Sequence, residues 1–167
     1  MMNMLRSKIL KNGLFNFFKK IIFYRKKQWV KNLLVFAAAL FSFEISKEII
    51  LNLFSTFTSF CLISKSIYLF YDIIDIENDR KHPSKKFRLI ASGQLSIGNA
   101  YLFLIFLFIT SLIIGFYVNY YTFLVLIFYF IIQVLYSLKL KNQPILDLVC
   151  ISSGFTLRAI AGVIAVG

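Results

Sequence analysis

Acidic residues are scarce in this chain of 167 residues, which has 7 Asp and Glu against 19 Lys and Arg and a formal net charge of +12. Charged residues make up 16% of the sequence, whereas a soluble domain carries about 25%. This shortage argues against an ordinary soluble domain. Cys61 and Cys150, the two cysteines, lie in apolar segments without the neighbouring ligands of a metal site. The single histidine, His82, has no helical partner, and we interpret it as a loop residue rather than a catalyst.

Hydrophobic residues dominate instead, at 59% of the chain, and they fall in blocks about as long as a bilayer is thick. The pattern predicts an all-α, polytopic bundle of transmembrane helices. We expect spans at about 30–45, 49–74, 100–118, 122–138 and 145–167. Residues 1–24 mix lysines with large apolar side chains, which favours a basic amphipathic segment at the membrane surface, followed by a transmembrane domain over 25–167.

The basic residues gather at the ends of the apolar blocks. Nine of the nineteen precede Asn32, and five lie between Arg80 and Arg88. By the positive-inside rule, the N-terminus and the charged loop at 77–98 are cytoplasmic in a multi-pass protein of the cell (inner) membrane. Because the charges mark topology and lipid contact, we expect no nucleic-acid partner.

Three carboxylates interrupt the cytoplasmic end of the second span. Asp72, Asp75 and Asp79 are spaced i, i+3, i+7, which places them on one helical face. Carboxylates in an apolar environment repel one another and are costly, and a shared divalent cation relieves both problems. Oxygen ligands with open positions suit Mg²⁺. The alternative is a solvated acidic helix end that pairs with Arg80 and Lys81.

Two cations are predicted inside spans. Lys65 precedes Asp72 by seven residues, so it lies on the same face about two turns deeper. It either lines a cavity that receives a substrate anion or compensates the carboxylates. Arg158 lies about three turns into the last span and must face protein or water, where it pairs with another helix or contacts an anionic headgroup.

The motif around the carboxylates resembles a known family. The stretch YDIIDIENDRKHPSKKFRLIASG is similar to the N-D-x-x-D-x-x-x-D motif of the UbiA superfamily of intramembrane prenyltransferases. Together with RKKQWVKNLLVFA and YSLKLKNQPILDLVCISSGFTLRAIAG, it resembles the polyprenyl-phosphate phosphoribosyltransferase branch of that superfamily.

The resemblance implies a function and a set of site residues. The branch transfers 5-phosphoribosyl from phosphoribosyl pyrophosphate to a polyprenyl phosphate with Mg²⁺, for cell-wall biosynthesis. Catalytic and metal-binding roles then fall on Asp72, Asp75 and Asp79. The donor-phosphate cations of the family fall on Lys31, Lys86 and Arg88. From their positions at or within the spans, we add Asn32, Tyr136 and Arg158 as candidate substrate-binding residues.

Two features depart from the family pattern. Tyr71 replaces the leading asparagine of the motif. The superfamily fold has about nine helices and a second polar motif in its later half, whereas the sequence predicts five spans. We therefore expect a truncated UbiA-like domain that is inactive as given. Other readings are prenyl transfer to an aromatic acceptor, an inactive remnant, or cation transport, although the basic loop favours a small, highly charged donor.

Overall fold

The computed structural model describes residues 29–41, 46–138 and 144–167, and the expected surface segment at 1–24 lies outside them. Nearly all of the described structure belongs to one compact unit, Lys31–Gly167. All regular structure in the described ranges is helical, which confirms the all-α class. The elements in chain order are α2 (Trp29–Asn32), η2 (Leu33–Phe36), α3 (Ala37–Phe41), α4 (Lys47–Ile74), α5 (Ile76–Lys81), η3 (Lys85–Phe87), α6 (Ile97–Val118), α7 (Tyr120–Leu138) and α8 (Pro144–Val166).

Four helices, α4, α6, α7 and α8, are long and apolar enough to cross a membrane. They lie where the last four spans were expected, and each begins slightly before the expected residue. Serine side chains cap two of them, because the Ser46 hydroxyl accepts a hydrogen bond from the Ile49 amide at 3.2 Å and the Ser96 hydroxyl accepts one from the Asn99 amide at 3.3 Å. The chain is a multi-pass helical membrane protein.

The expected first span, 30–45, is interrupted in the structure. A 3₁₀ turn, η2, separates α2 from α3, and residues 42–45 lie outside the described ranges. The backbone of η2 packs directly on α8, because a Cβ added to Gly162 would overlap the Val35 carbonyl oxygen and lie 3.0 Å from its carbon. Val35 and Ala161 are fully buried at this contact. The first segment therefore joins the bundle through backbone contact with α8.

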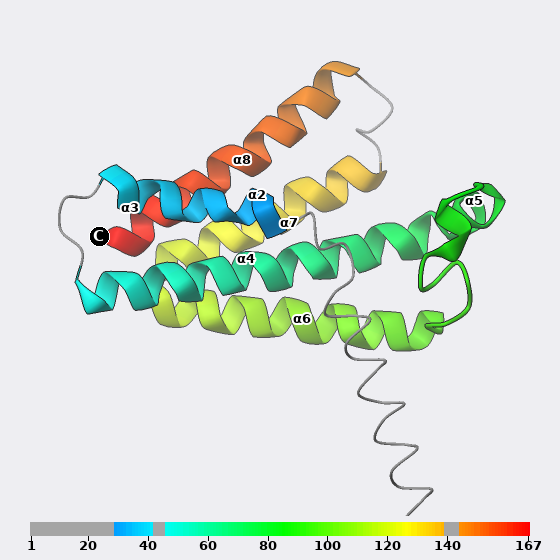
Figure 1. Ribbon diagram of the computed structural model, residues 1–167, viewed down its shortest axis with the longest axis horizontal. Helices are drawn as coiled ribbons and strands as arrows, with labels where there is room; N and C mark the ends of the chain where they lie inside the picture. The colour runs from blue at the N-terminus through cyan, green and yellow to red at the C-terminus, as the bar shows by residue number, and fades with distance from the viewer. Residues whose placement is uncertain (1–28, 42–45, 139–143) are drawn as a thin grey trace, which may run out of the picture. The chain divides into compact units, whose positions relative to one another are not determined.

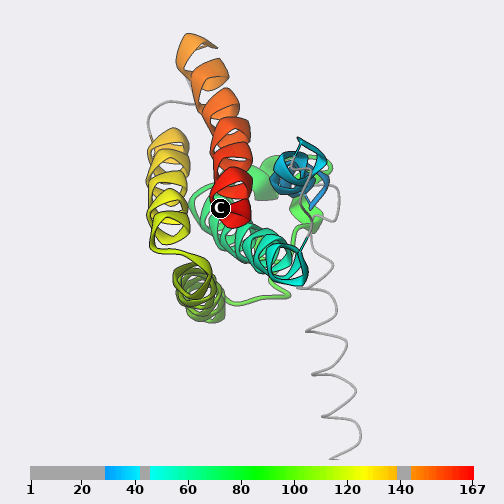
Figure 2. The same ribbon diagram turned by 90° about the vertical axis from the view of Figure 1, so that its left-hand side faces the viewer.

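Helix α4 is the central element of the bundle. It packs against α6, α7, α8 and η2, and Figures 1 and 2 show it running alongside α6. Four apolar side chains of α4 lie in the hydrophobic core: Leu53, Phe60, Ile63 and Ile67. Small polar side chains bring α4 and α6 together, because the buried Ser111 hydroxyl donates to the Ser59 carbonyl at 2.9 Å.

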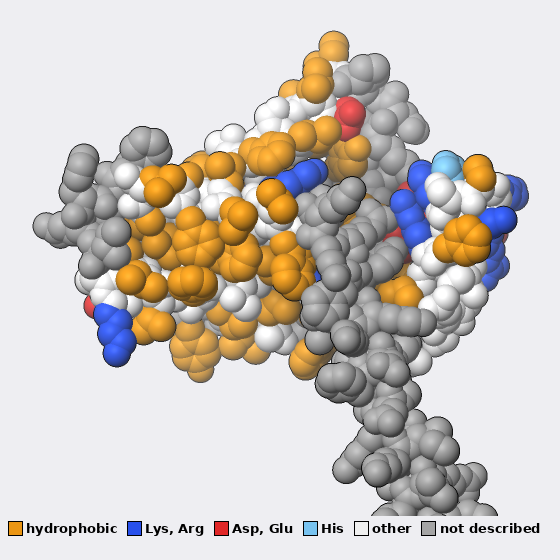
Figure 3. Space-filling view, viewed as in Figure 1, with side chains coloured by type: hydrophobic (Ala, Val, Ile, Leu, Met, Phe, Trp, Pro, Cys, Tyr) orange, Lys and Arg blue, Asp and Glu red, His pale blue; other side chains and the backbone are white. Residues whose placement is uncertain are grey.

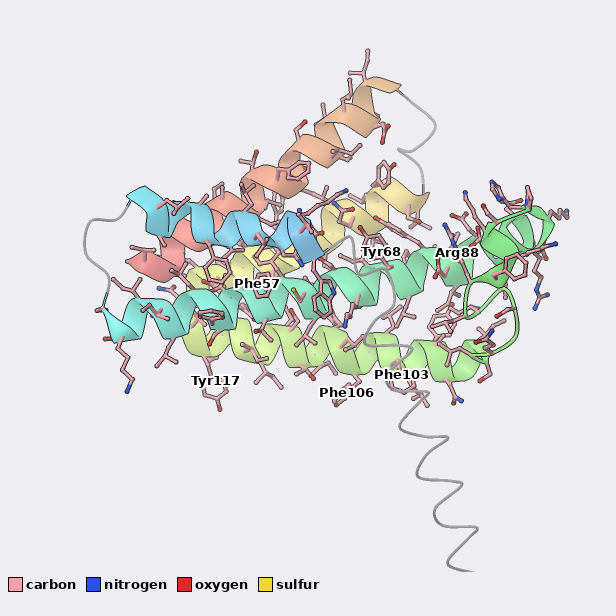
Figure 4. The ribbon with its side chains drawn as sticks, in the orientation of Figure 1. Phe57, Tyr68, Arg88, Phe103, Phe106 and Tyr117 are labelled. Atoms are coloured by element: carbon pink, nitrogen blue, oxygen red, sulfur yellow. The ribbon has the colours of Figure 1, made fainter. Side chains whose placement is uncertain are left out.

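Large apolar side chains face outward instead. Phe106 and Tyr117 project from α6 away from α4 (Figure 4) and are 64% and 84% exposed. Figure 3 shows apolar side chains across the helical body, while Lys and Arg gather near α5. A lipid environment favours this distribution, in which polar side chains lie between the helices and large apolar side chains face outward.

Candidate functional site

The acidic cluster lies at the joint between α4 and α5. Asp75 ends α4, and its amide donates to the Tyr71 carbonyl at 2.9 Å, while the Asp79 amide donates to the Asp75 carbonyl at 2.8 Å. The backbone therefore keeps turning through the joint. As a result Asp72 and Asp79, seven residues apart, face the same side, and both carboxylates are almost completely buried.

A guanidinium from the following loop joins the two carboxylates. Arg88 Nη1 lies 2.6 Å from Asp79 Oδ2 and 3.2 Å from Asp72 Oδ1. The loop presents Arg88 after η3, and the buried Leu89 and Ile90 anchor the loop beside the end of α4, where Figure 4 labels the arginine. The single positive charge of Arg88 thus bridges two buried carboxylates that would otherwise repel each other, and it leaves the group with one net negative charge.

This arrangement bears on Mg²⁺ binding. Asp75 is only half-buried, and in the described ranges no three His, Cys, Asp or Glu side chains come close enough to hold a metal ion. The structure therefore brings Asp72 and Asp79 together around one cation rather than forming a three-carboxylate centre. Mg²⁺ often binds one or two carboxylates and completes its shell with water and phosphate oxygens. The buried pair fits that mode of binding.

Other loop residues face solvent near this cluster. Lys86 is exposed, and its ammonium lies 5.2 Å from the centre of the Phe87 ring. Arg80 donates from Nε to the Ala91 carbonyl at 3.3 Å. The His82 ring has a local role, because Nδ1 accepts from the Ser84 amide at 3.2 Å. The exposed cations give this end of the molecule a positive surface (Figure 3).

A second polar cluster lies deeper in the bundle around Arg158, which is 6% exposed. Its Nε donates to Asn32 Oδ1 at 2.7 Å, its Nη2 to the Tyr129 hydroxyl at 2.7 Å, and its Nη1 to the Gly154 carbonyl at 2.6 Å. The guanidinium also lies 4.9 Å from the centre of the Tyr129 ring. Asn32 continues the network by donating to Cys61 Sγ at 3.3 Å.

The structure gives Lys31, Tyr71 and Tyr136 contacts with groups other than the carboxylates. Lys31 is exposed, with its ammonium 5.9 Å from the centre of the Phe155 ring. Tyr71, which replaces the family asparagine, points to α7 and donates to Gln133 Oε1 at 2.8 Å and to the Gln133 carbonyl at 3.0 Å. The Tyr136 ring lies 6.4 Å from that of Tyr71.

Sequence reasoning missed two participants in these networks. Gln133 carries the only side-chain amide within α7, and a polar side chain at that depth is a signal that could have identified it. Tyr129 is one of 9 tyrosines in an aromatic-rich chain, and nothing in the sequence distinguishes its buried hydroxyl from the others.

Fold and site together define a class: a polytopic helical membrane protein with a buried carboxylate–guanidinium cluster at the end of a spanning helix. Residues 32–167 match the UbiA prenyltransferase family. The chain belongs to that family.

Named relatives are similar over the same region. The chain is 40% identical over 146 residues to a decaprenyl-phosphate phosphoribosyltransferase from Mycolicibacterium smegmatis, covering 84% of this chain and 46% of the relative. It is 38% identical over 148 residues to the Corynebacterium glutamicum protein of the same name, covering 86% and 45%. Identity to the one from Mycobacterium tuberculosis H37Rv is 36% over 146 residues, covering 84% and 48%. The chain thus spans about half the length of these relatives.

Proposed function

We propose that this chain supplies the donor-binding part of a Mg²⁺-dependent transferase that moves 5-phosphoribosyl from phosphoribosyl pyrophosphate to a polyprenyl phosphate. The observation that carries the proposal is the bridge from Arg88 to the buried Asp72 and Asp79. The names of the relatives support the choice of donor and acceptor.

The cluster has the parts that a pyrophosphate site needs. Asp72 and Asp79 would hold the metal ion, whereas Asp75, the third predicted ligand, does not form a three-carboxylate group with them. Mg²⁺ would neutralise charge on the pyrophosphate and stabilise its departure. Arg88 can form a bidentate contact with phosphate oxygens as well as with carboxylates, and it lies where both can be reached. The exposed Lys86 adds positive charge at the entrance.

In the proposed reaction the bond between the anomeric carbon of the ribose and the pyrophosphate oxygen breaks. A phosphate oxygen of the lipid acceptor forms the new bond to that carbon, and pyrophosphate leaves. Arg88 and the nearby lysines balance the negative charge that grows on the leaving group, which is the electrostatic stabilisation that such transfers require. The part of the chain near Asp72 therefore binds and orients the donor.

The proposal also includes the membrane in which the protein lies and the side that its N-terminus and charged loop face. The protein lies in the cell (inner) membrane, with its N-terminus and the loop that contains Arg88 in the cytoplasm, because basic residues concentrate in those segments. A soluble, highly charged donor would then reach the site from the cytosol, and the lipid acceptor would enter from the bilayer.

Donor binding provides a direct test. The purified chain in nanodiscs should bind phosphoribosyl pyrophosphate only when Mg²⁺ is present, and Asp72→Ala should lower this affinity by on the order of a hundredfold, because it removes a charged ligand. Glu77→Gln is the matched control, because Glu77 is exposed in α5. Affinity in Asp72→Ala near that of the parent chain would reject the assignment. Preferential Mg²⁺-dependent binding of a prenyl diphosphate would replace it with prenyl transfer.

A further inference from the structure

We propose that the deep cluster around Arg158 is a second phosphate site, which recognises a phosphate monoester and lies further into the bundle than the acidic cluster. This inference rests on the proposed function, because it identifies where one of the two phosphate monoesters of the reactants, as distinct from the donor's pyrophosphate, binds.

The charge of Arg158 is the first argument. In the described part of the chain, the hydrogen-bond partners of its guanidinium are the uncharged Asn32, Tyr129 and Gly154. A buried cation among apolar helices is costly unless an anion compensates it, and dipoles and aromatic faces compensate only in part. The position is therefore already organised to receive a negative charge.

Donor capacity is the second argument. A guanidinium carries five N–H groups in a planar fork, and the three hydrogen bonds to protein use Nε, Nη1 and Nη2 once each. Nη1 and Nη2 can each donate once more. Gln133 brings a further donor to the same place, because a Cβ on Gly154 would lie 3.3 Å from both Arg158 Nη1 and Gln133 Nε2.

A second cation lies at similar depth on α4. The half-buried Lys65 is one turn from Cys61 on α4, and Asn32 bonds to both the Cys61 sulfur and Arg158 Nε. Two positive charges and several neutral donors therefore converge from α4, α7 and α8. Phosphate monoesters carry up to two negative charges and several acceptor oxygens, so their chemistry matches this set.

The spacing between the two clusters fits a ligand with phosphate groups at both ends. Lys65 precedes Asp72 by seven residues, which is a rise of about 10 Å along a helix. Tyr71, the residue before Asp72, bonds to Gln133, whose amide nitrogen lies, like Arg158 Nη1, 3.3 Å from a Cβ built on Gly154. The monoester bound near Arg158 is either the 5-phosphate of the sugar donor or the phosphate of the lipid acceptor, and these two sources share one chemistry.

Binding measurements without Mg²⁺ test the site separately from the acidic cluster. The purified chain in nanodiscs is titrated with ribose 5-phosphate, with farnesyl phosphate and, as the uncharged comparison, with farnesol. We expect at least one monoester to bind and Arg158→Gln to weaken it roughly ten- to hundredfold, as expected when a charged hydrogen-bonding partner is lost. Weakening of ribose 5-phosphate alone assigns the site to the donor, and weakening of farnesyl phosphate alone assigns it to the acceptor.

Controls separate binding from folding. Arg158→Lys keeps the charge but not the planar fork, so it should recover part of the affinity and provides a second folded variant. Tyr129→Phe removes a hydrogen bond to Arg158 and reports how much the network contributes to thermal stability alone. Arg80→Gln changes an exposed loop arginine and should leave monoester affinity unchanged.

Three results have distinct meanings. Monoester affinity that is equal in the parent chain and in a folded Arg158→Gln variant overturns this inference, even if Mg²⁺-dependent donor binding at Asp72 persists. Monoester binding that depends on Arg158, combined with no Mg²⁺-dependent donor binding, supports the second site and rejects the proposed function. Equal binding of farnesol and farnesyl phosphate, without binding of ribose 5-phosphate, also overturns the inference, because the phosphate then contributes nothing.

Discussion

Substitution of Arg88 by glutamine should destabilise the folded chain more than any other single change in the loop at 82–96. Arg88 is the shared partner of Asp72 and Asp79, whose side chains are 1% and 3% exposed, while its own is 24% exposed. Removing one partner of a buried ion pair costs about 3–5 kcal/mol. Because this guanidinium is partly solvated, we expect a loss of about 2–3 kcal/mol in the free energy of unfolding.

The assay is denaturation in detergent micelles without divalent ions. Arg80→Gln is the matched control, because it removes an exposed arginine that bonds to a backbone carbonyl, and it should cost less than about 1 kcal/mol. In the double variant Arg88→Gln/Asp79→Asn, one of the two uncompensated charges is gone, so part of the lost stability should return. Equal free energies of unfolding for Arg88→Gln and Arg80→Gln would contradict the ion pair of Arg88 with Asp72 and Asp79. So would a double variant whose loss of stability equals the sum of the losses in the two single variants.

Two further predictions concern the packing around the sites. Gly162→Ala should lower the free energy of unfolding by about 1–3 kcal/mol in the same assay, because its methyl group overlaps the Val35 carbonyl, whereas Gly98→Ala, with open space around it, should be within about 0.5 kcal/mol of the parent. Tyr71→Phe should cost about 0.5–1.5 kcal/mol, because the single hydroxyl proton shared by two oxygens of Gln133 is lost, and an unchanged melting temperature would contradict this contact.

The long helices could be predicted from the sequence because membrane spans depend on length and apolar composition, which are local properties. The interruption at 33–36 could not, because it coincides with a contact to a residue distant in the sequence. Gly162 lets the backbone of η2 approach α8, and no pattern within Leu33–Phe36 indicates this contact. The local conformation of the first segment thus goes with a tertiary contact that its own sequence does not reveal.

The partners of the acidic cluster show a similar limit. The spacing predicted that Asp72, Asp75 and Asp79 would share one face; the structure brings Asp72 and Asp79 to one guanidinium, and Asp75 is half-buried outside that pair. Pairing with Arg80 was the local alternative, since Arg80 is adjacent in sequence. The structure pairs them with Arg88 instead, because the loop turns back and leaves Arg80 exposed beside the Ala91 carbonyl. Which of several nearby cations pairs with a carboxylate depends on loop conformation, which the sequence did not determine.

The rotation of α4 about its axis controls both candidate sites, because this helix carries Asp72 at its end and Lys65 in its middle. Each residue advances an α-helix by about 100°, so a rotation by one residue would turn these side chains toward lipid. The hydrogen bond from Ser111 to the Ser59 carbonyl holds α4 against α6 at a close approach that large side chains would prevent. The small-residue contact therefore does more than pack two helices: it fixes the direction in which the charged groups face. A bulky residue at position 111 should for this reason impair binding at both sites together, although it contacts neither.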